Sequence, residues 1–242
     1  MRPTINLLWT GGLDSTFRLV ELSRENVEIQ PYYIIDPNRK STPQERKAMD
    51  QIYKLLKSKS QTKAILKNIR FIEINTIKPN KEITDSWKQF SDSHKLGCQY
   101  DFLARFAFQN NLILEVGIEN SCRSKAANTL KEYGNLQPDH YDGNTNEWAS
   151  FYRISDNCDS KECKIIFERL RFPKHLFSID KIKEVKLLKE WGCEDILHKT
   201  WFCHKPIFGL PCGKCNPCKD ALNEGLAWRV PILGRILGFV RF

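Results

Sequence analysis

The chain has 242 residues, of which 41% are hydrophobic, and its formal net charge is +9. This length and composition are normal for a soluble protein with a substantial core. They argue against a membrane protein, because no apolar stretch reaches the roughly 18 to 20 residues of a membrane span. Residues 1–20 also lack the charged lead and apolar run of a secretory signal, so we expect a cytoplasmic protein. In that compartment the nine cysteines indicate reduced thiols and metal binding.

The positive charge is concentrated in residues 38–70 and 161–189. Most of these lysines occupy polar positions of amphipathic helices, which favours a solvated helix face over a nucleic-acid surface. We therefore expect no nucleic-acid partner. ATP or an acidic protein partner would also suit the positive charge.

The first predicted element is a strand over residues 4–10, an apolar run with β-branched members. A glycine-rich turn and a helix over 14–25 follow at once. A strand, such a turn and a helix N-terminus together form an anion site, because free amides and the helix dipole face the ligand. An ordinary turn capped by Asp14 or Ser15 is the alternative, and the full motif after a strand favours the anion site. The residues of this motif are Thr10, Gly11, Gly12, Leu13, Asp14, Ser15 and Thr16.

The remaining elements alternate between strand and helix. Strands are predicted at 27–35, 69–75 and 112–118, and helices at 43–58 and 99–110. This alternation predicts an α/β fold: a Rossmann-like parallel sheet with helices on both faces. Such sheets bind nucleotides at the carboxyl ends of their strands, where the glycine-rich turn lies. Gly117 ends the 112–118 strand, and its lack of a side chain serves either a ligand or close packing.

Residues 131–164 interrupt the pattern with glycine, proline, Asn and Asp. We interpret them as an inserted loop or lid in a domain that spans residues 1–198. Cys158 and Cys163 lie in this segment, and without convincing partners they read better as ordinary thiols than as a second metal pair.

A cysteine quartet marks the C-terminal region, residues 199–242. Its spacing is C-x8-C-x2-C-x2-C, which suits tetrahedral zinc with no open position, and so a structural role. A disulfide pair, a chance arrangement or an iron–sulfur cluster is the alternative. The tail from Pro231 is expected to pack on the domain or on a sister subunit, which leaves a homodimer open. The four cysteines are Cys203, Cys212, Cys215 and Cys218.

Two of these motifs together resemble a known family. Thr10 to Ser15 resembles the S-G-G-x-D-S signature of the PP-loop ATP pyrophosphatases, with threonine in place of the first serine. A PP-loop at this position and the cysteine quartet near the C-terminus resemble the 7-cyano-7-deazaguanine synthases. The helix that opens at Lys181 and the segment Thr200 to Cys203 are similar to the family as well.

The resemblance implies an adenine nucleotide alpha hydrolase-like fold with ATP, Mg2+ and Zn2+. It implies a ligase that adenylates the carboxylate of 7-carboxy-7-deazaguanine and transfers it to a nitrogen nucleophile. The nucleophile is either ammonia, giving the nitrile, or another amine, even one on a protein. Thr10 to Thr16 and Gly117 would bind ATP, and the catalytic residues would be Asp14, Ser15 and Lys181. A surface lysine at a helix start is the alternative for Lys181.

The chain departs from the family at 36–41, 97–101 and 119–121, and we expect these segments to line the acceptor site. A guanine-like base needs a carboxylate or carbonyl for its N–H groups and a surface on which to stack. Arg123, with Lys125, would bind the acceptor carboxylate or pyrophosphate. The candidates for base recognition are Asp36, Tyr100, Asp101 and Glu119.

Other functions stay open. A PP-loop enzyme that thiolates RNA would use a reactive cysteine near ATP, for which Cys98 and Cys122 are the candidates. An enzyme that amidates a different acid would use the same loop. A zinc-stabilised nucleotide-binding module without turnover is disfavoured, because such a site need not keep the glycines and hydroxyls of the loop.

Overall fold

A computed structural model describes residues 2–118 and 124–239 of the chain. In these residues eight strands form one sheet in the order β3-β2-β1-β5-β8-β7-β6, and β4 also pairs with β2. The strands are β1 (Thr4–Leu8), β2 (Glu28–Ile35), β3 (Ile65–Leu66), β4 (Arg70–Glu73), β5 (Leu114–Glu115), β6 (Gln137–His140), β7 (Ser150–Arg153) and β8 (Leu170–Pro173).

Helices cover both faces of this sheet. The α-helices are α1 (Leu13–Ser23), α2 (Thr42–Ser58), α3 (Lys81–His94), α4 (Gln99–Gln109), α5 (Lys125–Tyr133), α6 (Lys161–Phe167), α7 (Lys174–Ser178), α8 (Lys181–Glu190), α9 (Glu194–Leu197), α10 (Asn216–Asn223) and α11 (Ile232–Phe239). Short 3-10 turns are η1 (Ile74–Thr76), η2 (Tyr141–Gly143), η3 (Glu147–Ala149) and η4 (Ala227–Arg229).

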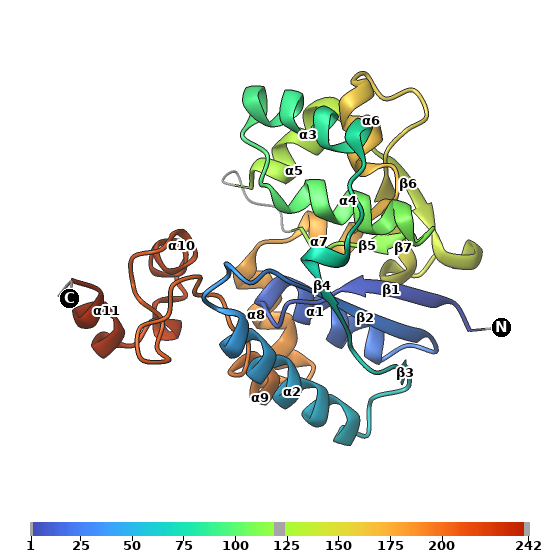
Figure 1. Cartoon of the computed structure of the whole chain (residues 1–242). Coiled ribbons are helices and arrows are strands. Elements are labelled where there is room, and N and C mark those ends of the chain that lie inside the picture. The colour runs from blue at the N-terminus through green and yellow to red at the C-terminus, as the bar shows by residue number, and fades with distance from the viewer. Residues whose placement is uncertain (1, 119–123, 240–242) are drawn as a thin grey trace.

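Six strands, β1 to β5 and β8, pair in parallel, which confirms the predicted α/β class. Each face of the sheet has its own apolar cluster, one beneath α1, α2, α8 and α9 and the other beneath α3 to α6. Figure 1 shows α3 to α6 on one side of the sheet and α2, α8 and α9 on the other. β2 is buried along most of its length, because helices cover it on both sides.

The order of the strands reverses around β1. The chain leaves β1 through α1 to β2 on one side, and it later returns to β5 on the other side of β1. This is the topological switch point at which open α/β sheets leave a crevice for ligands. Figure 1 shows the segment with α10 and α11 beyond this end of the sheet.

Residues 131–164 are not the loop that the sequence suggested. They contain β6 and β7, which pair antiparallel with each other and extend the sheet from the edge of β8. The strands are too short for a clear period, so only the pairing of β6 with β7 and of β7 with β8 reveals them. Cys158 Sγ donates to the carbonyl oxygens of Tyr133 and Ser160, and Cys163 is buried in the core. Both cysteines are therefore ordinary structural thiols.

A buried ionic cluster joins α1 to β5. The Arg18 guanidinium is fully buried and donates to both carboxylate oxygens of Glu115 and to Glu21. The Tyr141 hydroxyl donates a 2.8 Å hydrogen bond to Glu115 Oε2, and His175 Nδ1 forms a hydrogen bond with Glu21 Oε1. A fully buried charge is tolerated only when its hydrogen bonds are satisfied, as they are here. The cluster thus ties the first helix to the strand beyond the switch point.

The described part of the C-terminal tail packs against the cysteine-rich segment of the same chain. Of the two expectations, packing on the domain or on a sister subunit, the structure shows the first. Gly234 and Gly238 of α11 lie against the carbonyl oxygens of Pro211 and Cys212, where a side chain would overlap the backbone. The other side of α11 exposes Ile232, Leu233 and Ile236. Among the described helices, none combines the length and the apolar character needed to cross a membrane.

Candidate functional site

The loop between β1 and α1 has the backbone of an anion site. Gly11 has a φ of +70°, a left-handed conformation that favours glycine. Gly12 is the N-cap of α1 and provides no side-chain cap. The amides of the first turn have no partner within the helix and face outward with the positive end of its dipole. The alternative that Asp14 or Ser15 caps an ordinary turn is wrong.

The hydroxyl groups of the motif have different surroundings. Ser15 Oγ lies 3.3 Å from Thr10 Oγ1 and 3.3 Å from the Thr10 nitrogen, so the two residues close the loop on itself. Thr16 Oγ1 accepts a 3.0 Å hydrogen bond from Trp9 Nε1 and is fully buried. The Thr16 hydroxyl therefore lies in the core, contrary to the expectation that it adds a donor to the loop. It occupies a helical position that faces the sheet.

A cavity of about 220 Å³ opens beside this loop. Asp14 and Lys181 both line it, although they come from distant helices. Lys181 begins α8, and its Nζ lies 3.7 Å from Glu224 Oε2. The other lining residues are Thr10, Gly12, Leu13, Arg39, Glu45, Trp201, Phe202, His204, Pro217, Asp220, Ala221, Leu226 and Arg229.

Sequence reasoning missed a polar part of the cavity wall that contains Arg39 and Glu45. Glu45 is buried and accepts hydrogen bonds from Tyr33 Oη, Arg39 Nε and Ser41 Oγ at 2.7 to 2.8 Å. Burial and the Glu45 charge raise the pKa of Tyr33, so its hydroxyl stays a donor. Arg39 and Ser41 belong to the segment 36–41, which departs from the family pattern. This departure was the signal in the sequence that could have drawn attention to them.

Arg229 was also missed. It is 9% exposed and lines the cavity, and its guanidinium lies over the Phe202 ring at 4.4 Å. Its Nη2 donates to the hydroxyl and the carbonyl oxygen of Thr200. Burial lowers the pKa of Arg229 to about 10, although the negative charges of Asp14 and Glu184 act in the opposite direction and raise it. At neutral pH it adds a positive charge to the cavity wall.

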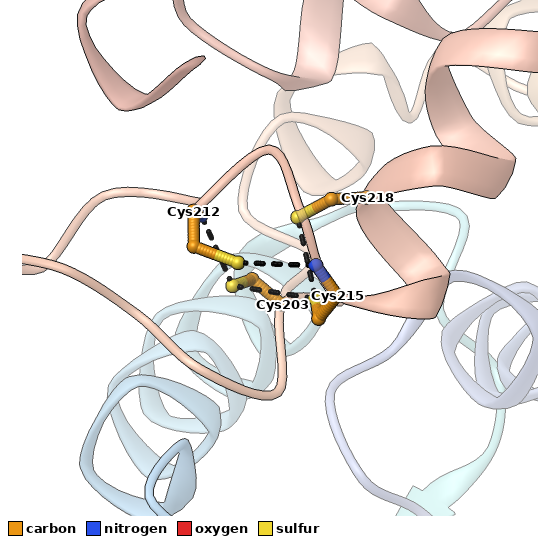
Figure 2. Close-up of side chains that lie close together, drawn as sticks. All are labelled: Cys203, Cys212, Cys215 and Cys218. Carbon is orange, nitrogen blue, oxygen red and sulfur yellow. Dashed lines mark hydrogen bonds between the residues drawn. The ribbon is translucent and has the colours of Figure 1, made fainter. Parts of the chain in front are cut away.

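The four predicted cysteines converge into one cluster (Figure 2). Their Sγ atoms all lie within 4.8 Å of one another, and Cys215 Sγ is 3.8 Å from Cys203 Sγ and 3.5 Å from Cys218 Sγ. A zinc ion with four thiolates at about 2.3 Å separates the sulfurs by about 3.8 Å. The thiols are free, so the disulfide alternative is wrong. The cluster can hold one tetrahedral metal ion.

Backbone amides support the cluster from outside. The Cys212 nitrogen donates to Cys203 Sγ, and the nitrogens of Lys214 and Cys215 donate to Cys212 Sγ, at 3.3 to 3.5 Å. Such hydrogen bonds orient thiolate ligands and stabilise their charge. Gly213 has a φ of +70°, which allows the tight turn between the ligands. We call residues 203–218 the knuckle.

The chain entering the knuckle also forms the edge of the loop. The Trp201 nitrogen donates a 2.8 Å hydrogen bond to the Gly11 carbonyl oxygen, and Trp201 Nε1 donates to the Cys203 carbonyl oxygen at 2.8 Å. Pro217 and Asp220 of α10 then complete the cavity from the far side. The cysteine cluster therefore positions one wall of the site and takes no place inside it.

Gly117 supports the loop from the neighbouring strand. A Cβ there would lie 2.9 Å from Leu176 Cδ2 and 3.5 Å from the backbone atoms Asp14 C and Ser15 N. The absence of a side chain at Gly117 therefore allows the segment after β5 to pack closely against the start of α1. A direct contact with ATP stays a prediction.

Asp36 lies next to the loop cavity. It lines a second cavity of about 280 Å³, which shares Arg39 and His204 with the first. Its Oδ1 accepts a 2.9 Å hydrogen bond from the Asn38 nitrogen, which fixes the turn after β2. Burial and the Arg39 charge lower the pKa of His204, so its ring is neutral at pH 7.

The other predicted substrate residues have structural partners or lie outside the described residues. Tyr100 is buried against Phe167, and burial raises its pKa to about 12. Asp101 accepts from Thr84 Oγ1 and forms a salt bridge with Arg105 at 2.7 Å. Their role in acceptor binding stays a prediction. Glu119, Arg123 and Cys122 lie outside the described residues.

Comparisons with known proteins give a weak structural likeness. No protein-family model matches the chain, and a search of curated proteins finds no match. A solved structure described as a 4-thiouridine synthetase–RNA complex with bound ATP is similar at 15% sequence identity and a TM-score of 0.42. The match covers 99% of this chain and 54% of the synthetase, so the chain spans about half the length of that protein. A likeness this low identifies no shared substrate or reaction.

Proposed function

We propose that the protein is an ATP-dependent ligase of the PP-loop type. It would transfer AMP from ATP to an acceptor carboxylate, release pyrophosphate, and pass the activated acyl group to a nitrogen nucleophile. One observation carries the proposal: the uncapped N-terminus of α1, from Gly12 to Asp14, lines one cavity together with Lys181, and His204 and Pro217 of the knuckle line the same cavity. Positive groups and free amides that meet at a switch point are what a nucleoside triphosphate requires.

Several residues of the cavity would have a role in this reaction. An acceptor carboxylate oxygen attacks the α-phosphorus, and the bond to the β-phosphate oxygen breaks as pyrophosphate leaves. The loop amides, Lys181 and Arg229 would stabilise the negative charge that grows on the leaving group. The buried set of Glu45, Tyr33 and Arg39 would hold the opposite wall rigid.

Two metal ions belong to the proposal. Asp14 and Asp220 line the cavity and can supply carboxylate oxygens to Mg2+, which binds through a few carboxylates and the substrate phosphates. Zn2+ would sit in the knuckle between Cys203, Cys212, Cys215 and Cys218, with a structural role. Mg2+ supplies charge neutralisation to the phosphates when bound.

The acceptor we propose is 7-carboxy-7-deazaguanine, as the family resemblance implies. Asp36 and the neutral ring of His204 line the cavity that adjoins the loop cavity at Arg39. A carboxylate such as Asp36 accepts the N–H groups of a guanine-like base, and Arg39 can bind the acceptor carboxylate. Ammonia would displace AMP to give the amide, and a second ATP would adenylate the amide oxygen so that it leaves with AMP and the nitrile forms. An amine on a protein would instead displace AMP to give a conjugate.

The test is an incubation of purified protein with ATP, Mg2+ and 7-carboxy-7-deazaguanine, with and without ammonia. Mass spectrometry should detect AMP, pyrophosphate and an amide or nitrile. Asp14→Asn should abolish these products, and Asp92→Asn, an exposed residue of α3, should leave them unchanged. Formation of ADP and phosphate would reject the PP-loop mechanism.

RNA thiolation is the second candidate, because it would use the same ATP loop. It would need a reactive cysteine near the activated base; of the two candidates, Cys122 lies outside the described residues. Cys98 is exposed at the start of α4. Incubation with transfer RNA, ATP and a sulfide donor, followed by nucleoside analysis, distinguishes this reaction from carboxylate activation.

A further inference from the structure

A larger cavity lies on the other side of the wall formed by Trp201, Phe202 and Arg229. It has a volume of about 620 Å³ and runs between α2, the segment after α9 and η4. We call it the α2 groove. Trp201, Phe202 and Arg229 line it and the loop cavity alike, so the two cavities lie back to back. The other lining residues are Pro43, Gln44, Lys47, Ala48, Gln51, Leu197, His198, Lys199, Thr200, Gly209, Pro211 and Trp228.

The α2 groove has a one-sided charge. Lys47, Lys199 and Arg229 line it together with His198, and in the described residues no aspartate or glutamate does so. This is not a general property of the surface, because the chain contains 29 acidic residues. Lys47 and Lys199 are exposed, so they can meet an anion without losing a structural partner inside the protein. A phosphate is the anion that such a set of cations binds well.

The groove also offers aromatic surfaces. Trp228 is 46% exposed and contacts His198 edge to face, with ring centroids 5.1 Å apart. Trp201 and Phe202 are half-buried in the opposite wall. An exposed tryptophan beside cations is a stacking platform for a nucleobase. An acidic peptide would use the cations and leave the tryptophan faces without a planar partner.

One polar atom of the groove lacks a partner. Gln44 Oε1 is buried and accepts no hydrogen bond from any described residue. A buried carbonyl oxygen in this state costs about 1–3 kcal/mol unless a ligand or water satisfies it.

We propose that the α2 groove binds a nucleotide, with the base stacked on Trp228 and the phosphate held by Lys47 and Lys199. The nucleotide is either free or part of a single strand, since both present the same base and phosphate. This site is separate from the loop cavity and does not depend on the proposed ligase activity. It also changes the interpretation of Lys47, which the sequence assigned to a solvated helix face.

Binding to full-length protein tests the proposal. Fluorescence anisotropy would follow a labelled single-stranded RNA of about ten nucleotides, with unlabelled RNA, DNA, AMP and GMP as competitors. For a strand, neutralisation of two phosphate charges by Lys47 and Lys199 predicts a slope of about −1.4 in log affinity against log salt. Competition by AMP or GMP at concentrations near those of the strand would assign a free nucleotide. Competition by strands alone would assign a single-stranded nucleic acid.

Matched variants separate the groove from general charge. Lys47→Glu should weaken binding at least about tenfold, whereas Lys57→Glu, an exposed lysine of the same helix outside the groove, should change it less than about twofold. Trp228→Ala should cost about 5- to 150-fold, and Trp228→Phe should recover part of this loss. Asp14→Asn should bind like the parent, which keeps this result independent of the ligase assay.

Three results would overturn the proposal. The first is no saturable binding of any strand or mononucleotide. The second is an equal loss in the Lys47 and Lys57 variants, which would mean diffuse attraction. The third is equal competition by duplex or by a polyglutamate peptide, because neither presents an unpaired base to Trp228.

Discussion

The main-chain nitrogen of Trp201 donates a 2.8 Å hydrogen bond to the carbonyl oxygen of Gly11. Trp201 precedes the knuckle and Gly11 lies in the loop before α1, so one hydrogen bond joins two segments that are far apart in the sequence. The same tryptophan donates from its ring to the Cys203 carbonyl oxygen. A structural change in the cysteine cluster would therefore reach the loop through Trp201.

Gly11→Ala should destabilise the protein more than Gly143→Ala does. Both glycines have a φ of +70°, which costs an alanine about 1–2 kcal/mol. A Cβ at Gly11 would also lie 3.1 Å from Met49 Cγ and 3.2 Å from the main-chain carbonyl oxygen of Glu45. A Cβ at Gly143 would have no atom of the described residues within 4 Å. Urea unfolding should show an additional loss of about 1–3 kcal/mol for Gly11→Ala. An equal loss of unfolding free energy in the two variants would mean that the loop can shift to accommodate the new methyl group at no cost.

Lys181→Met should lower kcat for pyrophosphate release about 100-fold with a smaller effect on the KM for ATP. The reason is that a charge facing the leaving group acts mainly in the transition state. Lys183→Met changes a lysine of the same helix that is exposed and does not line the cavity, and it should keep kcat within about twofold. Similar kinetics for the two variants would return Lys181 to the role of a surface lysine.

The purified protein should contain about one zinc ion per chain. Cys215→Ser should lose the metal and unfold the C-terminal segment, because metal binding to a thiolate cluster stabilises its fold. Cys98→Ser removes an exposed thiol and should keep both the metal and the fold. Elemental analysis with circular dichroism checks these outcomes. A metal-free wild-type protein with an intact fold would contradict the assignment.

Glu115→Gln should reduce the free energy of unfolding by about 3–5 kcal/mol. The substitution leaves the fully buried Arg18 with one carboxylate less, and an uncompensated buried charge is costly. Asp50→Asn breaks an exposed pair with Lys54 and should cost less than about 1 kcal/mol. Chemical denaturation of both variants measures the difference. A loss below that of Asp50→Asn would show that water reaches Arg18.

His175 should make stability depend on pH. Burial disfavours its charged form, but the hydrogen bond and charge of Glu21 together outweigh this effect and raise its pKa above 6.5. A raised pKa in the folded state stabilises the protein fully below about pH 6.5, and the stabilisation is lost as the pH rises through the folded pKa. Unfolding free energies measured from pH 6 upward should decline in the parent and stay flatter in His175→Gln. Parallel curves would assign the pH dependence to other groups.

The sequence by itself determined the features that depend on neighbouring residues. The loop from Thr10 to Ser15, its position between a strand and a helix, and the four knuckle cysteines follow from residue type and spacing over short stretches. The α/β class also follows from the sequence. When strands and helices alternate along the chain, few folds bury the apolar faces of both kinds of element. Local signals fix local geometry, since a turn or a C-x-x-C step closes within a few residues.

Only the tertiary structure decided which distant groups meet. Lys181 lines a cavity with Asp14, Arg18 is buried against Glu115, and Arg229 separates two cavities. None of these pairs has a spacing that a sequence pattern records. The strands β6 and β7 were missed for the same reason, because each is stabilised by its neighbour in the sheet and not by its own period. Burial decides the chemistry of these groups, and burial is a property of the folded chain alone.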